Sequence, residues 1–293
     1  VLISLIAGCT ANAPGEQERS LKYAEITFVV NIPGSNSSIN YSIEIVDEVT
    51  GLALNPSRYS LSMSPDGSFR ITLPFLMGSI LKYRYLQDGS PVKIEHTLRG
   101  DPVRYRVFLV DGVATVQDSV AGWAAEMPDD ISSGKISGVV TDSSGAPLPD
   151  VLISVAGEQM ISAPDGRFAF SAISPGTHLL AAISTNGSVQ SYQQGVTTHE
   201  NATTLVSLVL SKSRFVDITF TVKPPENTGG LPVRLVGNIT SLGNTFSDLY
   251  VGSSTVASRA PLLTYNLDGS YSITLNLPVG YDLRYRYTLG DGF

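Results

Sequence analysis

The sequence predicts an all-β protein composed of three tandem β-sandwich domains. Apolar and polar residues alternate with a period of two in many short segments, which is typical of strands with one buried face. Glycine and proline are concentrated between these segments, where turns are expected, and no long segment has a helical period. The chain has 293 residues, of which 42% are hydrophobic, so it is long enough for several domains and apolar enough to bury their cores.

Two similar segments, residues 66–85 and 268–287, bracket the chain and are identical at 11 of 20 positions. Each contains an Asp-Gly turn, an alternating strand, a glycine-bearing bend and a second alternating strand. Because side chains alternate across a strand, the second strand carries tyrosines on one face and basic residues on the other. We expect the tyrosine face to be buried and the arginines to lie on a solvated face. The tyrosines are Tyr83, Tyr85, Tyr285 and Tyr287, and the arginines are Arg84 and Arg286.

Residues 1–9 are apolar and end in the only cysteine of the chain, Cys9. This run is too short to span a bilayer, which needs about 20 apolar residues, and it is typical of the end of a signal peptide. Its last four residues, Ile-Ala-Gly-Cys, resemble the bacterial lipobox, in which the cysteine is lipidated. The resemblance implies an exported protein, anchored at Cys9 to a bacterial membrane and facing the cell exterior or the periplasm. The alternative is a buried strand with an incidental cysteine. Residues 10–20 are polar and serve as the expected linker.

The first module is expected at residues 21–128. Alternating segments at 23–30, 41–46, 103–110 and 114–120 predict strands in addition to the two of the repeat. Asp-Gly dipeptides at 88–89 and 111–112 predict hairpins between them. Several short strands separated by turns are typical of a β-sandwich.

The second module, residues 135–211, has a different pattern. Strands are expected at 135–142, 151–155, 168–170 and 179–183, with turns between them. The segment resembles the carboxypeptidase regulatory-like domain, a prealbumin-like β-sandwich, although Asp150 stands where many members carry glycine. The resemblance implies a non-catalytic spacer or structural partner. The matching residues are Gly138, Val140, Asp142, Gly145, Pro147, Leu148, Val151, Asp165, Gly166, Phe168, Pro175 and Gly176.

The third module, residues 214–293, begins with a strand at 216–222 that is similar to the first strand of the first module. Its segments Val236-Gly237, Ser241-Leu242-Gly243-Asn244 and Leu277-Pro278-Val279-Gly280, followed by Arg-Tyr-Arg-Tyr, resemble the starch-binding module of carbohydrate-binding family 20. The first module shows this resemblance more weakly. The first module continues well beyond its copy of the repeat, whereas the third does not, so we expect the third sandwich to be C-terminally incomplete.

The resemblance to starch-binding modules implies that polysaccharide stacks on exposed aromatic side chains. The family's first stacking tryptophan is replaced by Thr245, with Phe246 as the nearest aromatic residue, and Tyr250 lies in the same loop-like segment. Arg286 holds the family's basic position. We expect Trp123 to cap the core of the first module, with a role as a sugar platform as the alternative. The candidate carbohydrate-binding residues are therefore Phe246, Tyr250, Arg286 and Trp123.

Composition and motifs argue against other classes of function. The net charge of −7 disfavours nucleic-acid binding, and a single cysteine excludes a disulfide framework and a multi-cysteine metal site. The three histidines lie in separate contexts, and Gly-x-Ser-x-Gly, calcium-loop and phosphate-binding motifs are absent. The Asp-Gly aspartates are expected to stabilise turns. We therefore expect no catalytic residues, no metal and no cofactor.

These observations favour a non-catalytic surface lipoprotein whose outer modules bind a starch-like or other glucan. Two alternatives remain open at this point. The sandwiches are spacers in a structural stalk or adhesin, which is favoured by the absence of the family's stacking tryptophans at Thr245 and, in the first module, at Ile94; or they are the accessory region of a larger glycoside hydrolase.

Overall fold

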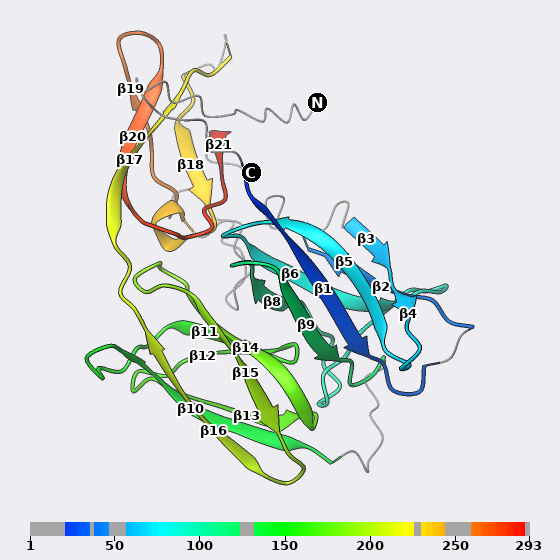
Figure 1. Cartoon of the computed structure of the whole chain (residues 1–293). Coiled ribbons are helices and arrows are strands. Elements are labelled where there is room, and N and C mark those ends of the chain that lie inside the picture. Colours follow the sequence, from blue (N-terminus) through cyan, green and yellow to red (C-terminus); the bar gives the residue numbers. More distant parts are fainter. Residues whose placement is uncertain are drawn as a thin grey trace.

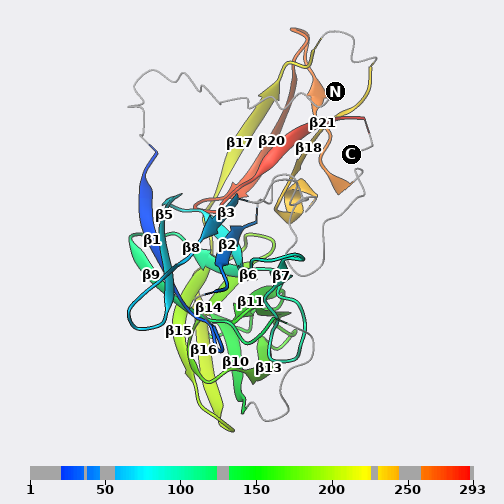
Figure 2. The same cartoon turned by 90° about the vertical axis from the view of Figure 1, so that its right-hand side faces the viewer.

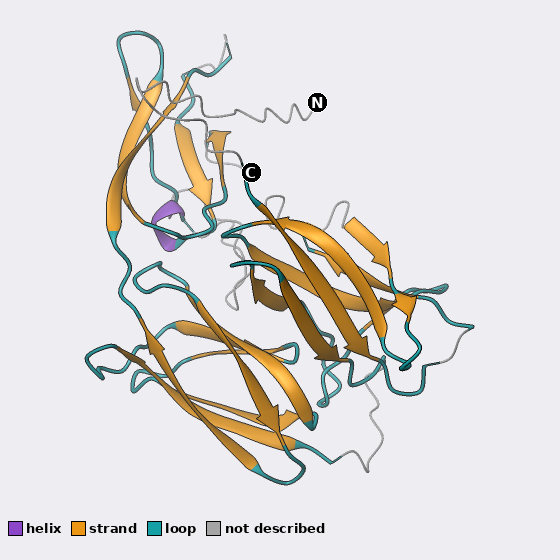
Figure 3. Ribbon diagram, in the orientation of Figure 1, coloured by secondary structure: helices purple, strands orange, loops and turns teal. Residues whose placement is uncertain are grey.

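The computed structural model describes residues 21–35, 38–46, 57–123, 132–225, 230–243 and 259–290. Within these ranges the regular structure is almost entirely β, with one short 3-10 helix, η1 (Thr240–Leu242) (Figure 3). The strands form three successive pairs of sheets. The predicted all-β fold of three tandem sandwiches is thus confirmed.

The first module contains two sheets with a shared core. One has the strand order β4-β5-β1-β9, and the other has the order β3-β2-β6-β7, with β8 also paired to β6. The first strand of the module, β1, pairs antiparallel with β5 and parallel with β9. The strands are β1 (Tyr23–Asn31), β2 (Tyr41–Ile45), β3 (Ser57–Ser60), β4 (Ser62–Met63), β5 (Phe69–Leu76), β6 (Ile80–Gln87), β7 (Lys93–Ile94), β8 (Arg106–Leu109) and β9 (Ala114–Ser119).

The second module is also a two-sheet sandwich, with strand orders β13-β10-β16 and β12-β11-β14-β15. Strand β10 lies between an antiparallel and a parallel neighbour. Gly138, in the middle of β10, leaves room for the ring of Phe168 and the backbone of Val206. The strands are β10 (Gly134–Asp142), β11 (Val151–Val155), β12 (Glu158–Ile161), β13 (Arg167–Ile173), β14 (Gly176–Ser184), β15 (Tyr192–Thr198) and β16 (Thr203–Leu210).

The third module repeats part of the first. Its described sheets are β17-β20-β19 and β18-β21. A threonine pair marks the shared register, because the hydroxyls of Thr27 and Thr72 are 2.8 Å apart and those of Thr219 and Thr274 are also 2.8 Å apart. The strands are β17 (Phe215–Val222), β18 (Val233–Gly237), β19 (Thr264–Tyr265), β20 (Tyr271–Pro278) and β21 (Tyr285–Leu289).

The two copies of the repeat also share their turn. The carboxylates of Asp66 and Asp268 each accept hydrogen bonds from the hydroxyl and the backbone amide two residues later, on Ser68 and Ser270. These bonds lower the pKa of both carboxyl groups. The aspartates therefore stabilise turns, as the sequence predicts.

The repeat tyrosines of the first module lie in its core. Tyr83 and Tyr85 are fully buried and pack edge-to-face. In the third module, Tyr285 and Tyr287 are partly buried against the core. The prediction for Arg84 was wrong, because its side chain is mostly covered and forms an ion pair with the fully buried Glu44. The ion pair with Glu44, on the neighbouring strand β2, thus holds the Arg84 side chain against the sheet.

The three modules meet at one place and do not form a straight rod. In Figure 1 the second module (green) and the third (yellow to red) follow one another from bottom to top, and the first (blue to teal) lies beside both. The view turned by 90° shows the same order of the second and third modules (Figure 2). No helix in the described ranges has the length and hydrophobicity needed to cross a membrane.

Candidate functional site: the junction of the three modules

The structure separates the residues that the sequence singles out. Trp123 is partly buried and stacks on Tyr41, with 5.5 Å between ring centroids and 26° between the ring planes. Arg286 lies far along the chain on β21 of the third module and is exposed. Cys9, Phe246 and Tyr250 lie outside the described residues. One face of Trp123 is therefore taken up by Tyr41, and no sugar site is assembled from the described candidates.

A buried polar network, which the sequence did not indicate, lies beneath the first module's tyrosines. Arg106 donates to Glu95 (Nη2–Oε2 2.8 Å) and to Asp118 (Nη1–Oδ1 3.0 Å), and all three side chains are buried. The hydroxyls of Tyr83 and Tyr85 donate to the second oxygen of Asp118, at 2.8 and 2.9 Å. Burial and the Asp118 charge raise the pKa of both tyrosines well above its usual value. Every group is satisfied within the core, so this network is structural.

The first and second modules are joined by the side-chain amide of Gln193, which bonds to a backbone N–H and a backbone carbonyl as a neighbouring strand would. Gln193 on β15 accepts a hydrogen bond from the backbone N–H of Leu109 (2.8 Å) and donates one to its carbonyl (2.9 Å). Arg99 and Glu158 add an ion pair at 2.7 Å. A hydrophobic cluster lies between the modules, formed by Tyr105, Val107, Leu152, Ala181 and Ile183. Apolar burial with matched backbone contacts fixes this interface.

The second and third modules meet through backbone acceptors. Tyr281 donates its hydroxyl to the carbonyl of Ser184 (3.3 Å), and Thr240 donates to that of Thr185 (3.2 Å). Burial, with a contribution from the neighbouring Asp282 carboxylate, raises the pKa of Tyr281. At Gly187, an added Cβ would lie 2.5 Å from Cγ of Pro278. The backbones of the second and third modules therefore approach closely here.

The first and third modules are joined by a bond between equivalent positions of the repeat. The backbone N–H of Ile80 donates to Oδ2 of Asp282 at 2.9 Å, and these residues lie 202 positions apart. The two repeat copies, which begin at Asp66 and Asp268, are offset by the same number. Arg284 holds the Asp282 carboxylate through two hydrogen bonds of 3.1 Å. Each module is thus bonded to both others.

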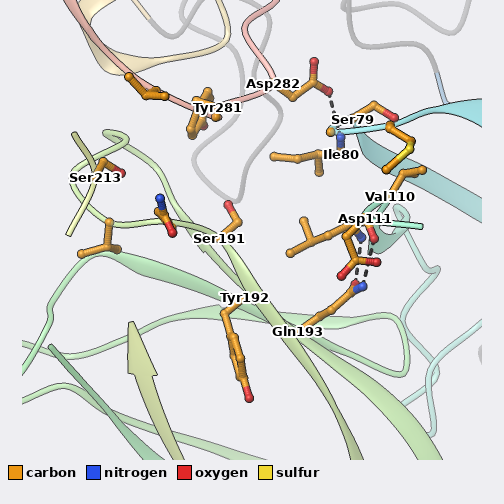
Figure 4. Close-up of a pocket in the computed structure, with 17 residues that line it drawn as sticks. Ser79, Ile80, Val110, Asp111, Ser191, Tyr192, Gln193, Ser213, Tyr281 and Asp282 are labelled. Atoms are coloured by element: carbon orange, nitrogen blue, oxygen red, sulfur yellow. Dashed lines mark hydrogen bonds between the residues drawn. The ribbon is translucent and has the colours of Figure 1, made fainter. Parts of the chain in front are cut away.

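A cavity of about 530 Å³ lies where the three modules meet. Its wall includes Ser79 and Asp111 from the first module, Gln190 and Gln193 from the second, and Tyr281 and Asp282 from the third. Figure 4 shows the amide of Gln193 directed at the first module and Asp282 directed at Ile80, so both point across the gap between modules. Among the described residues, no group of three or more His, Cys, Asp or Glu side chains could hold a metal ion. Among these polar side chains, those of Gln193, Tyr281 and Asp282 join modules to one another.

Sequence reasoning missed the junction residues, although one signal was present. Asp282 is a carboxylate at the position where the first copy of the repeat has the apolar Ile80. Such a replacement within an otherwise similar repeat indicates a function specific to one copy. Gln193 offered no comparable signal, because its partner, Leu109, lies 84 residues away in another module.

An exposed aromatic residue was also missed. Tyr265, in β19, is 62% exposed and packs edge-to-face on Tyr271, with 5.1 Å between ring centroids. The neighbouring Asn266 donates hydrogen bonds to the hydroxyls of Ser270 (2.9 Å) and Ser272 (3.0 Å). An exposed aromatic ring beside amide and hydroxyl groups has the composition of a sugar-contacting surface.

Comparison with known proteins identifies the second module. A family model for the carboxypeptidase regulatory-like domain matches residues 135–211, which confirms the resemblance inferred from the sequence. The match covers this module only. Comparison with curated proteins gives no match.

Comparison with solved structures returns pilins and a glucoamylase. A streptococcal ancillary pilin has 10% identity and a TM-score of 0.31, with 91% of this chain and 89% of the pilin covered. A minor pilin of Streptococcus agalactiae has 13% identity and a TM-score of 0.27, with 65% and 97% covered. A glucoamylase of Hypocrea jecorina has 16% identity and a TM-score of 0.26, with 33% of this chain and 17% of the enzyme covered. At these values the similarity says nothing about what this chain binds.

Proposed function

We propose that the described region is a non-catalytic structural scaffold in which three β-sandwiches hold one another at fixed angles. The observation that supports this proposal is the bonding pattern at the junction, where the side chains of Gln193, Tyr281 and Asp282 join each module to the other two through backbone groups. Hydrogen bonds to backbone groups depend on the precise relative position of the modules. A chain of independent spacers has no need of such contacts.

Distances between spin labels test the scaffold. Labels on cysteines at the exposed positions Val113, Leu205 and Leu267 report on the first, second and third modules, taken in pairs in a Cys9→Ser background. A rigid scaffold gives one narrow distance distribution for each pair. Broad distributions for the three pairs would show that the modules move independently and would overturn the proposal.

We further propose that the scaffold is exported and anchored by a lipid on Cys9, because residues 6–9 match the lipobox pattern. Expression in a bacterium with a lipoprotein-processing pathway tests this. Mass spectrometry of the N-terminal peptide should find a diacylglyceryl group on Cys9, and the protein should fractionate with membranes. A Cys9→Ser variant should lose both properties. Unmodified Cys9 in the purified protein would contradict the anchor.

Carbohydrate binding is a second candidate function, and the exposed ring of Tyr265 is the observation that favours it. Affinity electrophoresis in gels containing starch, or α- and β-glucans of other linkage, measures it directly. Replacing Tyr265 with alanine should weaken binding by about tenfold or more, which corresponds to about 1.4 kcal/mol. Tyr23→Ala is the matched control, because Tyr23 is 61% exposed on the first module. An unretarded wild-type chain in every gel would exclude this candidate.

A further inference from the structure

The first strands of the outer modules have different surroundings although they occupy equivalent positions. Ile26 of β1 pairs with Leu73 of the repeat, and Ile218 of β17 pairs with Leu275, the same position of the second copy. Strand β1 has β9 on its other side, in parallel. Within the described residues, the sheet of the third module ends at β17. The edge that β9 covers in the first module therefore has no described counterpart in the third.

The inward-facing side chains of β1 and β17 differ in their exposed fraction. Ala24 and Ile26 are 4% and 0% exposed, whereas their equivalents, Val216 and Ile218, are 44% and 37% exposed. Both pairs are apolar. The third module therefore keeps the apolar residues that are buried in the first module, but among its described residues nothing covers them fully. Exposed apolar residues at a sheet edge favour the addition of another strand.

The other sheet of the third module, β18-β21, also has no described counterpart of a strand that is present in the first module. In the first module, residues 80–83 of β6 pair antiparallel with β8, and β6 begins at Ile80. In the third module the corresponding strand, β21, begins only at Tyr285, so residues 282–284 have no strand structure. Leu81 is buried, whereas its equivalent, Leu283, is only partly buried. The absence of a β8 counterpart among the described residues explains both differences.

In the first module these two positions are filled by one continuous element. Strands β8 and β9 are consecutive and are joined by the Asp111-Gly112 turn, so one hairpin adds a strand to each sheet. Its inward-facing residues, Phe108 and Val116, belong to the first core. We infer that β17 and residues 282–284 form a single acceptor for a β-hairpin of the β8–β9 type, joined to the end of β21 as β8–β9 follows β6.

The acceptor defines the chemistry of this hairpin. Its first strand runs antiparallel to residues 282–284 and places a large apolar residue beside Leu283, as Phe108 lies beside Leu81. Its second strand runs parallel to β17 and has apolar residues opposite Ile218 and Phe220, where β9 has Ala114 and Val116 opposite Ile26 and Phe28. A covalent connection keeps the hairpin at high effective concentration beside the acceptor.

Hydrogen exchange on the unmodified chain is the first test. The backbone amides of β17 should exchange about tenfold or more faster than those of β1, because β1 is paired on both sides and β17 on one. Equal protection of β1 and β17 would show that the edge is already covered and would overturn the inference.

A chimaera tests the occupant. Residues 88–123, which contain the hairpin and its connection to β6, are attached after Leu289 in place of the last four residues. Exchange in β17 should slow by about tenfold or more, and Ile218→Asp in the same chimaera should abolish the effect. An unchanged β17 in a chimaera whose first two modules keep their native exchange rates would overturn the inference.

Two further experiments test whether the hairpin belongs to the same chain, to a partner or to a second copy. Free peptide 88–123, added to the unmodified chain at micromolar concentration, should protect β17 far less than the attached copy. Equal protection would overturn the covalent source and indicate a hairpin from a partner. Sedimentation should find the unmodified chain monomeric, and a dimer that Ile218→Asp dissociates would show that a second copy occupies the edge.

Discussion

At the scale of single residues, the first module keeps three charged side chains away from water. Arg106 is enclosed by Glu95 and Asp118, and it also donates to the carbonyl of Ser119 at 2.8 Å. Burial alone disfavours the charged guanidinium, but the two carboxylates outweigh this effect and raise the pKa of Arg106. The two carboxylates depend on this one cation, so its removal leaves buried charges without compensation.

Replacement of Arg106 by methionine is therefore expected to destabilise the first module by about 3–5 kcal/mol, because Glu95 and Asp118 lose their buried partner. Urea denaturation, followed by the fluorescence of Trp123, measures the change. Arg70→Met is the matched control, because Arg70 and its partner Asp66 are both exposed, so that its loss should cost only about 0–1 kcal/mol. Adding Glu95→Gln and Asp118→Asn to Arg106→Met should recover part of the loss. A loss below about 1 kcal/mol for Arg106→Met would contradict this account.

His178 is a buried titratable side chain in the second module. Nε2 lies 2.6 Å from the carbonyl of Ser174 and must carry the proton, because a carbonyl only accepts. Nδ1 is buried and has no hydrogen-bond partner among the described residues. Burial lowers the pKa of His178 below 6.5, with Arg106 acting in the same direction and the Ser174 carbonyl and Asp118 opposing it. The folded state therefore favours the neutral form of this histidine more than the unfolded chain does.

The free energy of unfolding should fall as the pH drops below about 6.5, because the unfolded chain then binds a proton that folded His178 does not. Urea denaturation at pH 7.5 and pH 5.5 measures the difference. His178→Gln should reduce it, since glutamine can still donate to Ser174 but does not titrate. His199→Gln, at an exposed position, should leave it unchanged. If His178→Gln retained the full pH dependence, another group would be responsible.

At the scale of elements, strand β10 shows how closely the second module is packed. A Cβ at Gly138 would overlap the ring of Phe168 and the backbone oxygen of Val206. Gly138→Ala should therefore destabilise the module by about 1–3 kcal/mol, because a neighbouring strand must shift. The control is Gly195→Ala on β15, where nothing lies within 4 Å of an added Cβ. Differential scanning calorimetry compares the two, and equal melting temperatures would contradict the expectation.

Local sequence pattern predicted many of these strands because alternation is a local property. The expected strand at 151–155 matches β11, and that at 216–222 matches β17 within one residue. The parallel pairings of β1 with β9 and of β10 with β16 were not predicted. They join segments far apart in sequence, and alternation indicates which face of a strand is buried but not which strand lies beside it.

At the scale of the whole molecule, the junction depends on pairs that no local pattern reports. Gln193 resembles any polar residue on an exposed strand until Leu109 is placed opposite it. Asp282 could have been singled out by comparing the two copies of the repeat, but its partner is a backbone N–H, which every residue except proline has. The modules were thus predictable from the sequence, whereas their mutual arrangement was not.

Asp282→Ala should loosen the third module from the first, because it removes the acceptor for Ile80 and the partner of Arg284. Spin labels at positions 113 and 267 should then give a broader distance distribution than in the parent chain. Asp268→Ala is the control within the same module, since its bonds to Ser270 are local to the turn. An unchanged distribution for Asp282→Ala would assign the rigidity to other contacts.

The hydrogen bond between Ile80 and Asp282 also makes the order of the outer modules along the chain matter. It joins the same position of two duplicated units, yet only the third module supplies a carboxylate there. A recombinant with two first modules would place isoleucine opposite isoleucine, and the acceptor would be lost. A recombinant with the outer modules exchanged would present the carboxylate from the wrong side of the second module. The duplicated units are no longer interchangeable, and their order along the chain is part of what the sequence encodes.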